Sequence, residues 1–353
     1  MGEVPTPFQP DSAQPAPATF PVPPASSFST VPSAPFRPRR GLRGPHRQTL
    51  ASQFLVRRLH LPPVEERLFQ VEPEVQVLCR CHWQEARRQA VTVLIVHGLE
   101  GSSESQYVLG TSAKALAAGM NVVRMNVRNC GGTEALGPTL YHSGLSADVG
   151  AVARALLAEE NLSRLALLGF SMGGNLVLKM AGEWGREAPP ELRAVCAISP
   201  AVDLAPSAAA LHRPSNWIYE QYFLWSLRRH MRRKARLYPD RYQLQRLRRV
   251  WTLQQFDDRI TAHYCGFTSA ADYYARSSAA RVVERIAVPA LLIHSNDDPF
   301  IHILPETRAR LRANPCVQYV ETEHGGHCGF LADPDGYDGR WAERTVVEFL
   351  ARF

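Results

Sequence analysis

One serine of this sequence lies in a motif that could make it a nucleophile. Ser171 is the centre of Gly169-Phe-Ser-Met-Gly173, a G-x-S-x-G pattern. A strand-like run, residues 165–168, precedes the motif, and a helix-like run that begins at Asn175 follows it. Between a strand and a helix, small glycines permit a sharp turn that lifts the serine hydroxyl above the sheet edge at a helix N-terminus. This context predicts Ser171 as a nucleophile, whereas the motif alone would indicate only a glycine-rich turn with an incidental serine.

A serine hydroxyl becomes a good nucleophile when an imidazole takes its proton and a carboxylate orients that imidazole. On this type of turn the acid and the base follow the serine in the order Ser, Asp, His. Asp298 and His327 occur in that order, each just after a strand-like run. Two glycines before His327 would let it reach the serine, and Pro299 favours an extended conformation at Asp298. We predict Asp298 as the acid and His327 as the base, with Asp297 as the alternative acid.

The oxyanion of a tetrahedral intermediate needs N–H donors that are already in place, and loss of one donor raises the barrier by about 3 kcal/mol. The residue after the nucleophile commonly supplies one donor, which predicts the backbone N–H of Met172. A glycine-framed turn, His97-Gly-Leu-Glu-Gly101, offers Leu99 as the second. We interpret His97 as a structural anchor of this turn. Glu100 reads as a solvated loop residue, with a position at the mouth of the site as the alternative.

The elements that must position these residues follow from an alternation of short β-branched runs with helix-like segments. The runs that predict strands are 91–96, 122–127, 165–168, 195–199, 290–294 and 317–320, and a run at 75–79 suits a leading strand at a sheet edge. Amphipathic segments separate most of them, which is typical of an α/β fold with a mostly parallel sheet and helices on both faces. In such sheets ligands bind beyond the carboxyl ends of the strands. The candidate catalytic residues all lie at such ends.

No strand-like run interrupts residues 204–280, which predicts a helical cap inserted over the sheet. Between Leu211 and Val250 this segment has eleven Lys or Arg and two acidic residues, a net charge of 11 − 2 = +9 against +7 for the whole chain. Residues 217–227 are apolar on nearly all sides and precede a run of arginines, which suits the cover of an apolar acyl pocket or contact with an anionic lipid surface. A helix simply packed on the core is the alternative. A nucleic-acid surface is less favoured, because the arginines are interleaved with long aliphatic residues.

Composition sets the remaining expectations. Residues 1–40 are rich in Pro, Ala and Ser, so we expect a disordered tail before a hydrolase domain over residues 41–353. No basic segment followed by an apolar one marks a secretory signal, which predicts a cytoplasmic protein. The seven cysteines lack paired spacing and predict free thiols. We expect no metal and no organic cofactor, and the sequence leaves the oligomeric state open.

Several short stretches resemble the YheT-like family of α/β-hydrolases, which includes animal lipases and yeast ester synthases. The matching stretches are Gly44-Pro-His-Arg-Gln-Thr49, His97-Gly-Leu-Glu-Gly-Ser102, Arg128-Asn-Cys-Gly-Gly132, Tyr141-His-Ser-Gly144, Gly169-Phe-Ser-Met-Gly-Gly-Asn175, Phe256-Asp-Asp-Arg-Ile-Thr-Ala262, Asp272-Tyr-Tyr274, Asn296-Asp-Asp-Pro-Phe300 and His324-Gly-Gly-His-Cys-Gly-Phe330. The resemblance runs from about residue 44 to the C-terminus. It implies the α/β-hydrolase fold, esterase or lipase chemistry, and the triad Ser171, Asp298 and His327. The chain departs from the family at Asn129, where a glycine is frequent.

Four residues of these stretches have no assigned chemistry. We interpret His46 and His142 as structural. Asp257 and Asp258 follow a basic helical segment, and we expect them to pair with arginines of the cap.

The main hypothesis is hydrolysis of a small-molecule carboxylic ester with an apolar acyl chain through an acyl-enzyme on Ser171. One alternative is an acyltransferase, in which an alcohol replaces water as the acceptor of the same acyl group. A second alternative is a non-catalytic binding protein on a hydrolase fold. This second reading is weaker, because a binding protein would not need nucleophile, acid, base and both oxyanion donors together.

Overall fold

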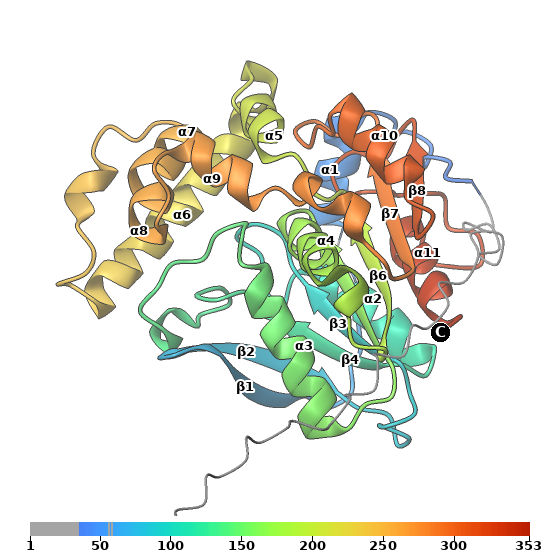
Figure 1. Cartoon of the computed structure of the whole chain (residues 1–353). Coiled ribbons are helices and arrows are strands. Elements are labelled where there is room, and N and C mark those ends of the chain that lie inside the picture. The colour runs from blue at the N-terminus through green and yellow to red at the C-terminus, as the bar shows by residue number, and fades with distance from the viewer. Residues whose placement is uncertain (1–34, 56, 58) are drawn as a thin grey trace, which may run out of the picture.

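The centre of the structure is one sheet of eight strands (Figure 1). A computed structural model describes residues 35–353 except 56 and 58. The strand order is β1-β2-β4-β3-β5-β6-β7-β8, with antiparallel pairing of β1, β2 and β4 and parallel pairing of all the others. The strands are β1 Glu65–Glu72, β2 Val75–His82, β3 Thr92–Val96, β4 Asn121–Met125, β5 Leu165–Phe170, β6 Leu192–Ile198, β7 Ala290–Ser295 and β8 Val317–Thr322. This sheet confirms the predicted α/β fold and its leading strands at one edge.

Helices cover both faces of the sheet because the central strands are apolar on both sides. On β3, Val93 and Ile95 pack in one cluster with residues of α2 and α11, whereas Leu94 and Val96 pack in another with residues of α3 and α4. Figure 1 shows α3 and α4 in front of the sheet. The helices are α1 Pro45–Phe54, α2 Gln106–Ala117, α3 Ser146–Glu160, α4 Met172–Trp184, α5 Leu204–Leu211, α6 Trp217–Leu237, α7 Leu253–Phe256, α8 His263–Cys265, α9 Ala270–Ser277, α10 Pro305–Ala313 and α11 Trp341–Leu350.

The connection between β6 and β7 contains α5 to α9 and no strand, where the sequence predicts a helical cap. In Figure 1 these helices, yellow to orange, lie at one end of the sheet. They have a hydrophobic core of their own, in which Leu224 and Leu227 of α6 join Phe256 and Tyr274. Phe300, which follows β7, belongs to the same cluster and connects the cap to the sheet. The cap is therefore packed on the ends of the strands that were expected to hold the chemistry.

The expected tail, residues 1–40, lies mostly outside the described residues, and its last part differs from the expectation. The ring centroid of Phe36 is 5.7 Å from that of Phe330 and 5.4 Å from that of Trp341. The N–H of Arg39 donates to the carbonyl of Leu331 at 2.8 Å. The last residues before position 40 therefore contact the hydrolase domain, which a single aromatic residue in a Pro-rich stretch is too weak a signal to reveal.

Within the described ranges, no helix is long and apolar enough to cross a membrane.

Candidate active site

Ser171 occupies a strained turn between β5 and α4. Its backbone angles are φ 53° and ψ −117°, and a positive φ is unfavourable for a residue with a Cβ. The N–H of Ser171 donates to the carbonyl of Ile198 at 3.0 Å, so the end of β6 holds the turn. A Cβ at Gly169 would overlap the backbone of Gly173, and a Cβ at Gly173 would overlap the backbone of Val96. Both glycines of the motif are therefore required by the close approach of strand and helix.

His327 and Asp298 lie in contact after β8 and β7. Nδ1 of His327 is 2.8 Å from Oδ2 of Asp298. The other carboxylate oxygen, Oδ1, accepts hydrogen bonds from the backbone N–H groups of Phe300 at 3.1 Å and Ile301 at 2.9 Å. Asp298 is thus oriented by its own loop, and one of its oxygens is directed at the imidazole.

Asp297, the alternative acid, has different partners. Its Oδ1 accepts the N–H of Gly326 at 2.8 Å and the hydroxyl of Ser295. Its Oδ2 is 3.3 Å from Nδ1 of His324. These contacts hold the loop before His327 rather than His327 itself.

The N-terminal helix α1 also supports the His327 loop, a role that sequence reasoning missed. The hydroxyl of Thr49 accepts the backbone N–H of His327 at 2.9 Å. The amide of Gln48 donates to the carbonyl of Leu331 at 3.1 Å and accepts its N–H at 2.7 Å. Both residues belong to the stretch Gly44–Thr49. The resemblance of this stretch to the family was the sequence signal that could have indicated its role. His46 of the same stretch contacts Tyr219 of α6, with 3.1 Å between Nδ1 and the hydroxyl oxygen.

Phe300 lies between the nucleophile's pocket and the base, and within the described part of the chain the nucleophile and the base share no hydrogen bond. Ser171 and Phe300 line the same pocket, and the ring centroid of Phe300 is 4.3 Å from that of His327. Across the described residues no hydrogen bond joins the Ser171 hydroxyl to His327, and Nε2 of His327 lies 3.8 Å from Sγ of Cys328. In sites without substrate, contacts of this kind are often long and tighten when the substrate binds.

The charge of the acid and base follows from their surroundings. Burial lowers the pKa of His327, but the neighbouring Cys328 and the Asp298 carboxylate together raise it above its usual value. Burial raises the pKa of Asp298, but the charge and the hydrogen bond of His327 lower it below its usual value. The pair therefore favours a charged carboxylate beside a basic imidazole, as the proton transfer from a serine requires.

Both predicted oxyanion donors are free to bind a ligand. Leu99 and Met172 line the pocket beside Ser171, and over the described ranges neither backbone N–H has a hydrogen-bond acceptor. The turn that carries Leu99 is fixed by its neighbours, since the N–H of Gly98 donates to the hydroxyl of Tyr107 at 3.0 Å. His97 accepts the N–H of Val127 at Nε2, 3.1 Å away, which agrees with its interpretation as an anchor.

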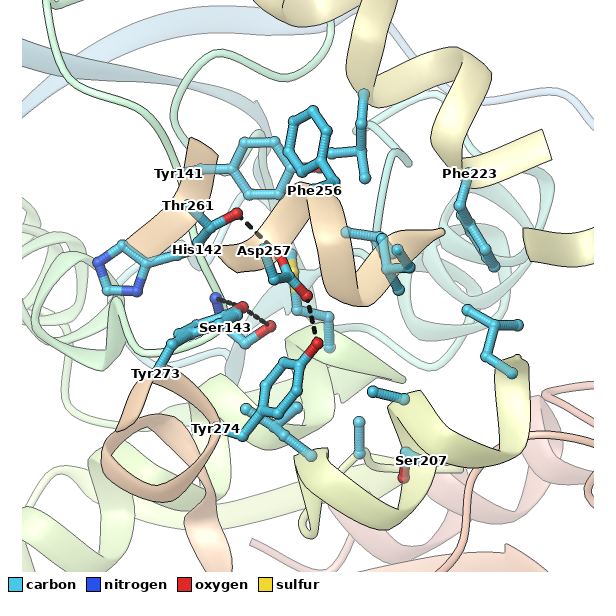
Figure 2. Close-up of a pocket in the computed structure, with 18 of the residues that line it drawn as sticks. Tyr141, His142, Ser143, Ser207, Phe223, Phe256, Asp257, Thr261, Tyr273 and Tyr274 are labelled. Carbon is cyan, nitrogen blue, oxygen red and sulfur yellow. Dashed lines mark hydrogen bonds between the residues drawn. The ribbon is translucent and has the colours of Figure 1, made fainter. Parts of the chain in front are cut away.

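A cavity of about 120 Å³ is lined by Ser171 and by residues of the cap. Figure 2 shows part of its wall. Its walls are mostly apolar and come from the oxyanion turn, α5, α6 and the loop after β7. The apolar lining residues are Leu99, Leu140, Met172, Ala201, Leu204, Ala208, Leu211, Phe223, Leu227, Met231, Leu253, Phe256, Phe300 and Ile301. A pocket of this composition can hold a hydrocarbon chain next to the nucleophile.

One wall of the pocket carries a buried polar group that the sequence did not reveal. The hydroxyl of Tyr274 donates to Oδ2 of Asp257 at 2.7 Å, and that of Thr261 donates to Oδ1 at 2.8 Å. Figure 2 shows both hydrogen bonds. Burial raises the pKa of Asp257 to about 6. The expected pairing with cap arginines is wrong for both aspartates, because Asp258 accepts the backbone N–H of Ala270 instead. Asp257 and Thr261 lie in the family-like stretch 256–262, and Tyr274 lies in the stretch 272–274. The hydrogen bonds among them give both stretches a structural role.

Over the described ranges, no group of three or more His, Cys, Asp or Glu side chains could hold a metal ion.

Comparison with known proteins places the chain among hydrolases. The family description "alpha/beta hydrolase fold" matches residues 91–334. YheT of Escherichia coli (strain K12), whose name gives esterase as its presumed activity, is 32% identical over 93% of this chain and 96% of its own. Phospholipase ABHD3 of Mus musculus is 28% identical over 73% of this chain but only 63% of its own. The Pyrococcus furiosus esterase Pf2001 shares the fold, with a TM-score of 0.55, 17% identity, and coverage of 84% of this chain and 98% of that one.

Proposed function

We propose that this chain, which belongs to the YheT-like branch of the α/β-hydrolase family, hydrolyses carboxylic esters through an acyl-enzyme on Ser171. The observation that carries the proposal is the 2.8 Å contact of His327 with Asp298, beside a strained serine turn that has free backbone donors. A binding protein would have no use for this combination.

The chemistry has two steps. The Ser171 hydroxyl attacks the ester carbonyl while Nε2 of His327 takes its proton, and the N–H groups of Leu99 and Met172 stabilise the oxyanion. The carbon–oxygen bond to the alcohol breaks, and His327 gives its proton to the departing oxygen. Water then attacks the acyl group, loses a proton to His327, and releases the carboxylic acid while Ser171 recovers its proton.

We infer that the substrate has an apolar acyl chain, because apolar side chains dominate the pocket walls next to Ser171. An alcohol could replace water in the second step and give a new ester. Measurement of acid and ethyl ester formed from one acyl donor in the presence of added ethanol distinguishes the two outcomes.

The test of the proposed function is a fluorophosphonate probe together with a p-nitrophenyl ester. We expect covalent labelling and ester cleavage in the native chain, and loss of both in Ser171→Ala. Ser163→Ala, at an exposed site that does not line the pocket, is the matched control. Undiminished ester cleavage by Ser171→Ala would refute the mechanism.

We further propose that the outer face of α6 contacts an anionic phospholipid surface. Ile218, Tyr222 and Trp225 are exposed on this face at three- and four-residue spacing, and Arg229, Arg232 and Arg236 continue the same stripe. Over the described ranges, the last three form no ion pair. Exposed aromatic residues followed by unpaired arginines suit the boundary between lipid tails and anionic headgroups.

Sedimentation with lipid vesicles tests this contact. We expect the native chain to bind vesicles with 30% phosphatidylserine and to bind vesicles of phosphatidylcholine alone roughly several-fold more weakly. The double variant Arg232→Glu, Arg236→Glu should lose binding to the anionic vesicles. The control is Arg186→Glu, on an exposed turn after α4, because it makes the same arginine-to-glutamate change at a site outside α6. Equal binding of the native chain and the double variant, or tighter binding to duplex DNA than to the vesicles, would overturn the proposal.

A further inference from the structure

The loop that carries the Leu99 N–H is attached to the cap by a buried carboxylate. Glu100 directly follows Leu99 and has φ 56°, a left-handed conformation that is uncommon for glutamate. Its side chain is 2% exposed. The expected solvated position of Glu100 is therefore wrong, because partners from two distant segments enclose its carboxylate.

These partners belong to the cap and to the loop after β4. Oε1 of Glu100 is 3.0 Å from Nδ1 of His230 on α6 and accepts the hydroxyl of Tyr141. Oε2 accepts the hydroxyl of Ser226, one turn earlier on α6. Three donors from outside the turn therefore hold the carboxylate, and two of them come from one helix of the cap.

His230 itself lies between acceptors on both sides of its ring. Nδ1 faces Glu100, and Nε2 faces the backbone carbonyl of Asn129 and, at 3.2 Å, Oε1 of Glu134. Two acceptors can be satisfied only if both ring nitrogens carry hydrogen, which makes the side chain an imidazolium. Burial lowers the pKa of His230, but the hydrogen bonds that its ring donates to Glu100 and Glu134 raise it to about 9.

Neighbouring residues of α6 continue this contact. Arg233 donates to Glu134 at 2.8 Å. Nζ of Lys234, which is fully buried, donates to Oδ1 of Asn129 at 2.9 Å and to the carbonyl of Glu134 at 3.0 Å. The inner face of α6 thus has a polar ridge, Ser226, His230, Arg233 and Lys234, that is seated on the loops after β3 and β4.

The same stretch of α6 also lines the pocket. Leu227, His230 and Met231 all contribute to its wall, on the side opposite the exposed stripe of aromatic residues and arginines. A displacement of α6 would therefore open the pocket and release Glu100 in one movement. Because Glu100 and Leu99 are consecutive, the direction of the Leu99 N–H depends on this seat.

We propose that His230 is a positioning residue for ester hydrolysis, which acts through Glu100 to hold the Leu99 N–H where the oxyanion forms. The inference rests on the proposed function. It assigns to the cap a role beyond covering the acyl chain, since the oxyanion site is complete only while α6 is seated.

The test compares His230→Gln with the native chain in steady-state hydrolysis of a p-nitrophenyl ester. Complete loss of one oxyanion donor lowers kcat by about 10²- to 10³-fold, so a misdirected donor should lower kcat by about 10- to 100-fold. KM should stay within about threefold, because Leu99 contributes to the transition state more than to the bound substrate. His212→Gln is the matched control, since His212 pairs with Glu220 within the cap and does not line the pocket.

A second measurement separates positioning from general damage to the cap. An alkylboronic acid forms a tetrahedral anion on the serine, whereas the corresponding alkyl alcohol occupies only the pocket. We expect His230→Gln to weaken the binding of the boronic acid by the same factor as it lowers kcat. The affinity for the alcohol should be unchanged. In a double variant with Glu100→Gln, the loss should not exceed that of the more damaging single variant, because both act through one contact.

Retention of kcat within twofold of the His212→Gln control, a rise of KM with kcat unchanged, or multiplicative losses in the double variant would overturn the inference. If His230→Gln does not fold, Ser226→Ala removes a single donor to Glu100 and should show the same pattern at about a two- to tenfold loss in kcat. If the native chain hydrolyses the ester and these variants do not change kcat, only the positioning role is refuted. Absence of ester hydrolysis in the native chain refutes the proposed function, and the positioning role with it.

Discussion

Replacement of Asp298 by asparagine should remove most of the activity while the fold is retained. Oδ1 of Asp298 accepts two backbone N–H groups, at 3.1 and 2.9 Å, and Oδ2 faces Nδ1 of His327 at 2.8 Å. In Asp298→Asn the amide oxygen can keep the two backbone hydrogen bonds only if the NH₂ group faces the imidazole. Nδ1 must then accept a hydrogen bond, and the single proton of the neutral ring moves to Nε2. A protonated Nε2 cannot take the proton of Ser171.

The size of the effect follows from the alternative orientation of the amide. If the asparagine turned its oxygen toward His327, its NH₂ group would face two buried backbone N–H groups and leave both unsatisfied. Each unsatisfied donor costs about 1–3 kcal/mol, so the productive orientation is disfavoured by about 2–6 kcal/mol. With a factor of ten for each 1.4 kcal/mol, this corresponds to a loss of about 30- to 10⁴-fold. The equivalent change in a serine protease lowers kcat by about 10⁴-fold with its geometry intact. Because the protease value lies at the upper end of this range, we expect a decrease in kcat of at least about 10²-fold rather than the minimum of about 30-fold.

The control is Asp297→Asn, one residue earlier. The amide oxygen can still accept the N–H of Gly326, and the main loss is the 3.3 Å contact with His324. Its kcat should fall by less than about tenfold. The assay is steady-state hydrolysis of a p-nitrophenyl ester, with thermal melting and circular dichroism to establish that both variants are folded. A larger loss in Asp297→Asn than in Asp298→Asn would refute the assignment of the acid, and about equal small losses would refute the need for an acid at all.

Three further predictions concern the base, the pocket and the N-terminus. The value of kcat/KM should rise with pH through the pKa of His327, because only the neutral imidazole accepts a proton. Burial lowers that pKa but Cys328 and Asp298 raise it, so the pH profile should have its midpoint above 6.5. A midpoint well below 6.5 would contradict the described surroundings. Ala208→Leu, on the pocket wall, should lower kcat/KM for a dodecanoate ester about tenfold, since two displaced methylenes are worth about 1.6 kcal/mol, and should leave kcat/KM for the acetate ester unchanged. Ala209→Leu, exposed beside it, is the control. Equal effects on both esters would argue against an acyl pocket here. A chain that lacks residues 1–40 should melt about 2–4 °C below one that lacks residues 1–34, because the longer deletion removes the contacts of Phe36 with Phe330 and Trp341, worth about 1 kcal/mol. Identical melting temperatures would mean that Phe36 contributes nothing to stability.

Local sequence determined the sheet and the identity of the candidate triad. Each predicted strand is a short β-branched run, and such runs are read from neighbours within a few residues. The turn at Ser171 was predictable for the same reason, since its glycines are needed by contacts within the motif and with the adjacent strand. The order Ser171, Asp298, His327 then followed from positions along the chain, while the choice between Asp297 and Asp298 remained a prediction.

Only the tertiary structure decided what surrounds these residues. Glu100 is 130 positions from His230 in the chain, and Thr49 is 278 positions from His327, so no local pattern connects them. Charge in the sequence was misleading in the same way: Asp257 lies near many arginines along the chain but binds Tyr274 and Thr261, because the cap turns its carboxylate into the pocket. A residue type and its spacing can specify which group is able to do chemistry. The partner that buries, charges or directs that group is chosen by packing between segments that are distant in the chain, and for this protein that choice is made where the cap meets the ends of the strands.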